Sequence, residues 1–301
     1  MNMRYVLLII CVGLGLLMAR PVSVDEILTK RLQFKLMGTL SYVHIQRSDM
    51  YLAPISVPIN GGSSYVQIPL SYAQDSNQDY LNFSLYARYG IAKRVEVFST
   101  LNSFWQHSSA SNDLSSTPIS QSYGDFSSLN LGVLIQAKKE GKLPALLLGA
   151  SADVLDKTYF SHTQKQLDSL KGYSFFATSF YTIDPIVLLL QANFRLNLPR
   201  EFEGYRLDNG EVFALSPMVY FAVNPYISLN FGVRYQYATQ NSINDTLSNT
   251  MRYVPQGSSV GYIFGMAYEI KSRFIFYASA EKLDTAQYSS DMLSFTLSYR
   301  I

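Results

Sequence analysis

The stretch LQANFRLNL, residues 190–198, decides the fold, because apolar and polar side chains alternate along it without a break. Successive side chains of a β-strand point to opposite faces, so this period of two predicts a strand with one apolar and one polar face. Residues 81–89, 227–237 and 293–301 repeat the alternation. The chain is therefore predicted to consist of many strands of the same kind.

The connections between these strands alternate between short and long. The short ones are residues 90–93, 139–143, 184–185, 224–225 and 271–272, and the long ones are residues 47–79, 107–125, 157–171, 199–210, 239–257 and 285–290. Five short and six long connections make eleven, which gives twelve strands with both chain ends on the short-turn side. This pattern predicts an all-β fold, a transmembrane antiparallel up-and-down β-barrel of about twelve strands with short periplasmic turns and long extracellular loops.

Two local details qualify this count. Residues 65–72 have strand character, but a thirteenth strand would place the N-terminus outside, so we assign them to the first long loop. Pro217 lies inside a predicted strand, where it cannot donate a ladder hydrogen bond, and is expected to mark a β-bulge.

A soluble β-sandwich is the alternative architecture. Its strands are about five or six residues long, whereas those predicted here are about twice that length, near the 9–11 residues that cross a bilayer. Only 15% of the residues are charged, against roughly 25% in a soluble domain. The alternation also continues to the last residue, Ile301, as in the terminal strand that barrel-assembly machinery recognises. We therefore favour the barrel, with outer-membrane lipid and that machinery as partners.

The N-terminus predicts export. Arg4 precedes an uncharged, mainly apolar stretch, residues 5–18, which has the charge and length of a secretory signal peptide. We predict a signal peptide over residues 1–19, a periplasmic segment over 20–31 and the barrel over 32–301, located in the cell outer membrane. Cys11, the only cysteine, lies within the signal peptide, so the mature chain is expected to need no disulfide.

Composition excludes other classes. The net charge is +2, too small for the basic field that holds nucleic acid. After the N-terminus no apolar run approaches the roughly 20 residues of a spanning helix. These features argue against a nucleic-acid partner and against a helical transporter.

The two faces of the predicted wall carry different residues. Tyrosine and tryptophan near the strand ends are expected to form two belts at the membrane interfaces. The expected belt residues are Tyr80, Tyr89, Trp105, Tyr226, Tyr237, Tyr262, Tyr268 and Tyr299. A charge facing lipid at the bilayer midplane costs roughly 2–4 kcal/mol, so charged strand residues are expected to face the lumen. These lumen candidates are Arg88, Arg94, Glu96, Lys138, Asp153, Arg195, Arg234, Glu269, Glu281 and Arg300. They form either a mutually neutralising, solvated wall or a constriction that selects by charge.

A family resemblance follows from the turns. Residues 88–97, RYGIAKRVEV, look like the strand-turn-strand unit of the MetA-pathway-of-phenol-degradation family of outer-membrane transporters. Residues 184–188, 224–229 and 298–301 are similar to the later hairpins and the end of that family. The resemblance spans residues 32–301 and implies uptake of hydrocarbon or aromatic compounds.

Catalytic chemistry is weakly represented. The three histidines are His44, His107 and His162, and the neighbours of His107, Ser108 and Ser109, lie in a serine-rich loop without an acid at a fixed spacing. We therefore predict no catalytic residue, no cofactor and no metal site. The predicted function is a non-enzymatic channel for passive passage of small molecules, hydrophobic or aromatic ones included. The alternatives are a non-conducting structural or surface-interaction barrel and a pore for an exported polypeptide.

Overall fold

The computed structural model describes residues 28–47, 55–59, 64–68, 76–112, 115–159, 165–202, 204–245, 250–254, 256–271, 273–285 and 288–301. No helix in this part of the chain is long and apolar enough to cross a membrane. The predicted signal peptide lies outside the described residues, as does the predicted N-terminal segment up to residue 27.

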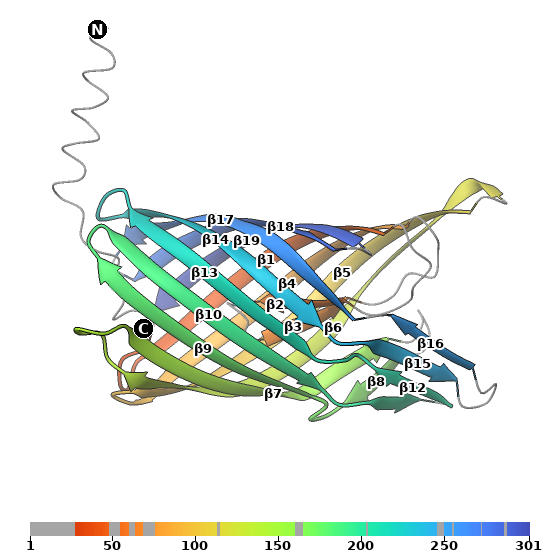
Figure 1. The fold of residues 1–301 in the computed structure, drawn as a ribbon, viewed down its shortest axis with the longest axis horizontal. Coiled ribbons are helices and arrows are strands. Elements are labelled where there is room, and N and C mark those ends of the chain that lie inside the picture. Colours follow the sequence, from red (N-terminus) through yellow and green to blue (C-terminus); the bar gives the residue numbers. More distant parts are fainter. Residues whose placement is uncertain are drawn as a thin grey trace, which may run out of the picture.

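Twelve antiparallel strands form the barrel (Figure 1). They are β1 (Phe34–Arg47), β4 (Ser76–Ala92), β5 (Val95–Asn112), β6 (Ser115–Lys138), β7 (Ala145–Tyr159), β9 (Gly172–Ile183), β10 (Ile186–Asn197), β13 (Val212–Ala222), β14 (Ile227–Ala238), β17 (Gly257–Lys271), β18 (Phe274–Asp284) and β19 (Tyr288–Arg300). Each pairs with its neighbour in the chain, β1 also pairs with β19, and the pairing of β6 with β7 completes the ring. The predicted fold class and strand number are confirmed.

Seven further strands belong to the long connections. They are β2 (Ile55–Ile59), β3 (Ser64–Ile68), β8 (Lys165–Asp168), β11 (Arg200–Phe202), β12 (Tyr205–Asp208), β15 (Asn241–Asp245) and β16 (Thr250–Val254). β8 pairs with the long-loop end of β7. A separate sheet at the same end of the barrel consists of β11, β12, β15 and β16. β2 and β3 pair only with each other, so residues 64–68 are part of the first loop, as predicted.

The expected bulge at Pro217 is absent. Pro217 is paired with Leu190 of β10. Toward β14 the register is the same before and after it, with Leu215 opposite Tyr235 and Met218 opposite Gly232. The missing proline N–H therefore interrupts the ladder locally without inserting a residue.

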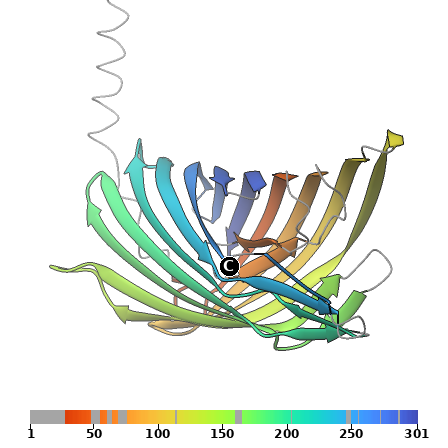
Figure 2. The same ribbon diagram turned by 45° about the vertical axis from the view of Figure 1, so that its right-hand side comes forward.

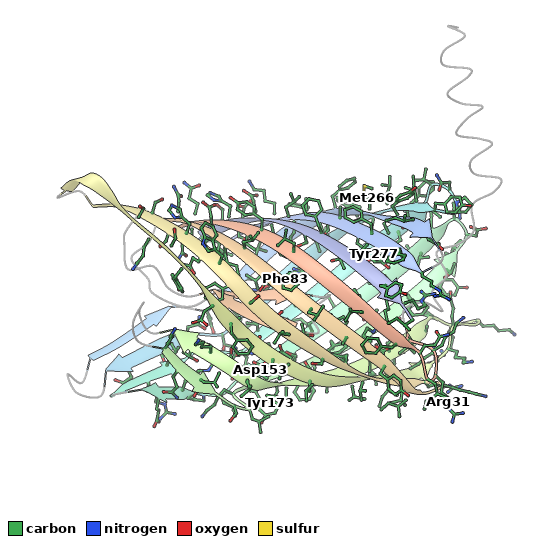
Figure 3. All side chains as sticks on the ribbon, turned by 180° about the vertical axis from the view of Figure 1, so that it is seen from behind. Arg31, Phe83, Asp153, Tyr173, Met266 and Tyr277 are labelled. Carbon is green, nitrogen blue, oxygen red and sulfur yellow. The ribbon has the colours of Figure 1, made fainter. Side chains whose placement is uncertain are left out.

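The outer face of the barrel is apolar. Phe83, Phe231, Phe264 and Met266 are among its exposed side chains, and Phe83 and Met266 lie on the wall in Figure 3. Of the expected belt residues, Tyr89, Trp105, Tyr226, Tyr262 and Tyr268 are exposed and Tyr237 and Tyr299 are half-buried.

Tyr80 departs from the expected belt, because it is only 1% exposed. It is one residue out of phase with Leu81 and Phe83, so it shares the inner face with Asn82 and Ser84. Its ring stacks on Phe104, with 5.0 Å between centroids.

Candidate functional site: the barrel lumen

One ion pair is buried on the inner wall, toward the long-loop end of β10. Arg195 of β10 and Asp153 of β7 are each 1% exposed, and the Arg195 guanidinium binds both carboxylate oxygens. Its Nε donates to Asn197 Oδ1 at 3.0 Å, and Nη1 donates to Ser174 Oγ at 3.2 Å. Asp153 also accepts a hydrogen bond from Asn130. A buried charge needs such partners, because its desolvation cost is otherwise uncompensated.

A chain of hydrogen bonds extends from this pair along the inner wall to β4. Ser84 Oγ of β4 donates to Asn102 Oδ1 of β5 at 2.7 Å. Asn102 Nδ2 in turn donates to Asn130 Oδ1 of β6 at 3.2 Å, and Asn130 donates to Asp153. The chain therefore fixes four neighbouring strands from the inside.

Two more Arg–carboxylate pairs lie on the inner wall. Arg88 Nε of β4 donates to Glu96 Oε1 of β5 at 2.6 Å. Arg234 Nη1 of β14 donates to both oxygens of Glu281 on β18, at 2.6 and 2.8 Å. All four side chains are buried. Six of the ten charged candidates are thus brought together as three internal pairs.

The other four candidates lie near the short turns. Arg94 and Lys138 are exposed, in contrast to the inward position expected for them. Arg94 is part of the turn between β4 and β5, and Lys138 ends β6, so neither is held within the wall. Glu269 and Arg300 are half-buried near the ends of β17 and β19.

A further charged cluster, which the residue pattern did not predict, lies near the long-loop end. Arg200 binds Asp156 of β7 and lies 3.9 Å from Asp168 of β8, and these three residues are nearly inaccessible. Arg200 and Asp168 lie in regions predicted as loop, where charges are ordinarily solvated. Only the sheet extension at this end brings them together.

The inner wall is not uniformly polar. Seven inward apolar residues near the short-turn end, here called the lower cluster, pack together: Tyr86, Phe98, Leu134, Ala145, Leu147, Phe180 and Val187. Strict alternation predicts a polar inner face, but aromatic rings also occur at inner positions. Phe98 and Phe176 cover Gly132 and Gly149, where an added Cβ would lie 2.2 Å from the rings.

The β2–β3 hairpin lies inside the barrel (Figure 2). Val66 of β3 packs with Val43, Ile45, Tyr80 and Phe104, which we call the hairpin cluster. These four wall residues come from β1, β4 and β5. One face of the hairpin is therefore anchored to this side of the wall.

The other face of the hairpin contacts the opposite wall. Tyr65 and Val66 are consecutive strand residues, so their side chains point to opposite faces. The guanidinium carbon of Arg195 on β10 lies 5.6 Å from the centre of the Tyr65 ring. Between β1 and β10 lie five strands in one direction (β4, β5, β6, β7 and β9) and five in the other (β19, β18, β17, β14 and β13). The hairpin therefore crosses the lumen along a diameter.

The N-terminal segment enters the other end. The Thr29 N–H donates to Glu96 Oε2 at 2.7 Å, and Leu28 packs on the lower cluster. The absence of a side chain at Gly90 allows the backbone of Lys30 to lie against β4, because an added Cβ there would lie 2.1 Å from the Lys30 carbonyl oxygen. Arg31, which bridges to Gly90, marks this end of the barrel in Figure 3.

The inner wall differs in accessibility around the ring. On β4 and β5, the inward residues from Gln78 to Arg88 and from Glu96 to Gln106 are all buried, and we call this surface the packed arc. On β18 and β19 six inward residues are half-buried, and these form the half-buried arc: Ile275, Tyr277, Ser279, Met292, Ser294 and Thr296. Accessible area on an inward side chain reports space within the barrel.

A separate polar row lies on the outer face near the long loops. His107 Nδ1 lies 2.7 Å from the Oγ of Ser122 on the next strand, β6. The His107 ring stacks on Trp105. Asp79, opposite His107 in the register, binds His44 and Tyr42.

Among the described residues no group of three His, Cys, Asp or Glu side chains is arranged to hold a metal ion.

The comparisons with solved structures agree with the observed architecture. The COG4313 outer membrane channel from Pseudomonas putida F1 has a TM-score of 0.59 at 12% identity, covering 89% of this chain and 95% of that one. The translocator domain of the autotransporter NalP from Neisseria meningitidis has a TM-score of 0.52 at 10% identity, with 89% and 88% covered. At these identities the likeness shows the fold, that of an outer-membrane β-barrel.

No family model and no curated protein matches the chain. The resemblance to the MetA-pathway-of-phenol-degradation family therefore stays a prediction.

Proposed function

We propose that the protein is an outer-membrane channel for passive passage of small molecules, whose lumen is closed in this structure by the β2–β3 hairpin. The observation that carries the proposal is the half-buried arc. Its inward side chains retain accessible surface, whereas a barrel filled only to stabilise itself would bury them throughout. The lipid-compatible outer face supports a location in the outer membrane.

The path follows the half-buried arc from the short-turn end. Glu269 and Arg300 are half-buried at its beginning, and hydroxyl groups of Ser294 and Thr296 lie farther along it. Met292 ends it, because this side chain packs against the hairpin cluster. The arc thus supports a path from the periplasmic side that stops below the hairpin.

We expect charge selection to occur at the short-turn entrance of the lumen, here called the mouth. The six candidates in the three buried pairs neutralise one another and have almost no exposed surface, so they hold the wall together. Glu269 and Arg300 keep solvent contact and are the groups that a permeant ion would meet first. The cargo class, hydrophobic and aromatic molecules included, rests on the sequence resemblance.

Planar-bilayer recordings test the channel. We expect a variant in which residues 48–75 are replaced by a short Gly-Ser turn to conduct several-fold more than the wild type. Ser294→Trp, introduced into that shortened variant, should reduce conductance by filling the half-buried arc, while Ser120→Trp, an exposed loop-end substitution, serves as its control. Heat-modifiable migration in gels checks that each barrel is folded. A folded, shortened variant with no conductance above a leak control would overturn the proposal.

The second candidate is a non-conducting barrel that acts through its loops. The packed arc favours it, because Glu96, Thr100 and Asn102 have no exposed surface. The same recordings separate the two, since only a non-conducting barrel remains closed after the hairpin is removed.

A further inference from the structure

The contacts of Tyr65 single out one region of the inner wall. Inward residues of β13 are small there: Ala214 and Ser216. Longer polar side chains flank them, Asn193 and Arg195 on β10 and Gln236 and Arg234 on β14. We call these six residues the Tyr65 subsite. Tyr65 lies against this region through Arg195, whose guanidinium carbon is 5.6 Å from the centre of the Tyr65 ring.

Tyr65 is deeply enclosed in this place. It is 2% exposed, and its ring lies over the Arg195 guanidinium. Burial raises the pKa of its hydroxyl to about 12, while the positive charges of Arg234 and Arg195 act in the opposite direction. The side chain is therefore a neutral phenol ring that lies against the Arg195 guanidinium.

The hydrogen bonding of the subsite is incomplete. The Tyr65 hydroxyl, Asn193 Oδ1 and Gln236 Oε1 are buried, and none of them has a hydrogen-bond partner within the described part of the chain. Asn193 and Gln236 both face Ala214 from neighbouring strands. Leaving a buried polar atom unpaired costs about 1–3 kcal/mol, so these amides are suited to a ligand that brings hydroxyl groups.

The charge balance restricts that ligand. Arg195 is neutralised by Asp153 and Arg234 by Glu281, so the subsite carries no excess charge. An anion would have to compete with a carboxylate already bound to each guanidinium. A neutral solute meets a flat cationic surface, small side chains and free amide acceptors.

We propose that the Tyr65 subsite binds a neutral ring bearing hydroxyl groups, and that Tyr65 occupies it as a built-in competitor which the solute displaces. The inference rests on the proposed channel function. Because Tyr65 and Val66 together tie the hairpin to both walls, displacing Tyr65 releases one of the two attachments. Solute binding is thereby coupled to opening.

Two chemical sources fit this description, aromatic alcohols and monosaccharides. The probes are p-cresol, which is the tyrosine side chain as a free molecule, and glucose. Toluene, which lacks the hydroxyl, is the matched control. A solute that binds only the open form raises the ratio of open to closed channels about tenfold when its concentration is about ten times its Kd.

The experiment records wild-type single channels while each probe is titrated. We expect one hydroxylated ring to increase the open fraction, and toluene to leave it unchanged. A response to p-cresol identifies the aromatic source and a response to glucose the saccharide source, and either supports the subsite. Equal responses to toluene, or no response to either hydroxylated ring, overturn it.

Variants separate the subsite from nonspecific effects. Tyr65→Ala should open without solute and lose most of the response. Asn193→Leu, similar in size, should weaken the response, because it removes one of the unpaired amide acceptors of the subsite. Ser120→Ala, at an exposed loop end, is the control. If the shortened-loop variant conducts but wild type ignores the probes, this inference fails and the channel function stands. If no folded variant conducts, the channel function itself fails.

Discussion

The packed arc and the half-buried arc belong to one wall with one alternation, yet their inner faces differ. The packed arc carries large groups such as Tyr86, Phe98 and Phe104, and both internal segments attach there, the hairpin through Val66 and the N-terminal segment through Thr29. The half-buried arc carries one aromatic ring, that of Tyr277, and three small hydroxyl side chains, those of Ser279, Ser294 and Thr296. The space left in a twelve-stranded barrel thus depends on side-chain size and on what docks inside.

The largest expected effect comes from breaking an ion pair of the packed arc. Glu96→Ala leaves the Arg88 guanidinium buried without its carboxylate and removes the acceptor for the Thr29 N–H. Such a loss costs about 3–5 kcal/mol. In the half-buried arc, Ser279→Ala should stay within about 0.5 kcal/mol. Urea unfolding in detergent micelles measures both, and equal losses would abolish the distinction between the arcs.

A glycine substitution beside the Arg195–Asp153 pair sharpens the comparison. A Cβ added at Gly172 would lie 2.1 Å from Arg195 Nη2 and from Asp153 Oδ2, whereas one added at Gly38 meets nothing within 4 Å. Gly172→Ala is therefore expected to destabilise the barrel by about 1–3 kcal/mol and Gly38→Ala by much less. The same unfolding assay compares them. A larger loss for Gly38→Ala contradicts the packing described here.

The smallest effects are expected outside the lumen. Arg94 and Lys138 are exposed at the turns, so replacing both by Ala should change stability by no more than about 0.5 kcal/mol. It should also leave the reversal potential of the shortened-loop channel in a salt gradient unchanged. Arg300→Ala at the half-buried mouth should shift that potential toward cation selectivity. A shift from the turn variants alone would move the selecting charges to the turns.

Much of the wall was predictable from local pattern. Period two along residues 81–89 assigns Arg88 to the inner face and Phe83 to the outer face, and the structure places both there. The prediction that Tyr80 belongs to an interface belt was wrong, because its position near a strand end was given more weight than its place in the two-residue alternation. The prediction for Arg94 was wrong because alternation does not extend into the turn, and that for Lys138 because the register shifts between Gln136 and Lys138 at the end of β6.

The partners of these residues were not predictable. Arg195 and Asp153 are 42 positions apart in the chain, and nothing local indicates that β7 and β10 bring them together. Arg200 and Asp168 lie in segments that read as solvated loop. Pairing across the ring depends on strand register, which all the strands set together.

The sequence by itself determined the barrel, the number of its strands and, away from turns and register shifts, the side of the wall that a strand residue faces, because those properties follow from a two-residue period and from loop lengths. Only the tertiary structure decided that the lumen is crossed by the first loop and entered by the N-terminal segment. The physical reason is that these segments are held by contacts between distant residues, Val66 on the hairpin cluster, Tyr65 on Arg195 and Thr29 on Glu96. Such contacts form only once the closed wall has placed opposite strands at a fixed separation.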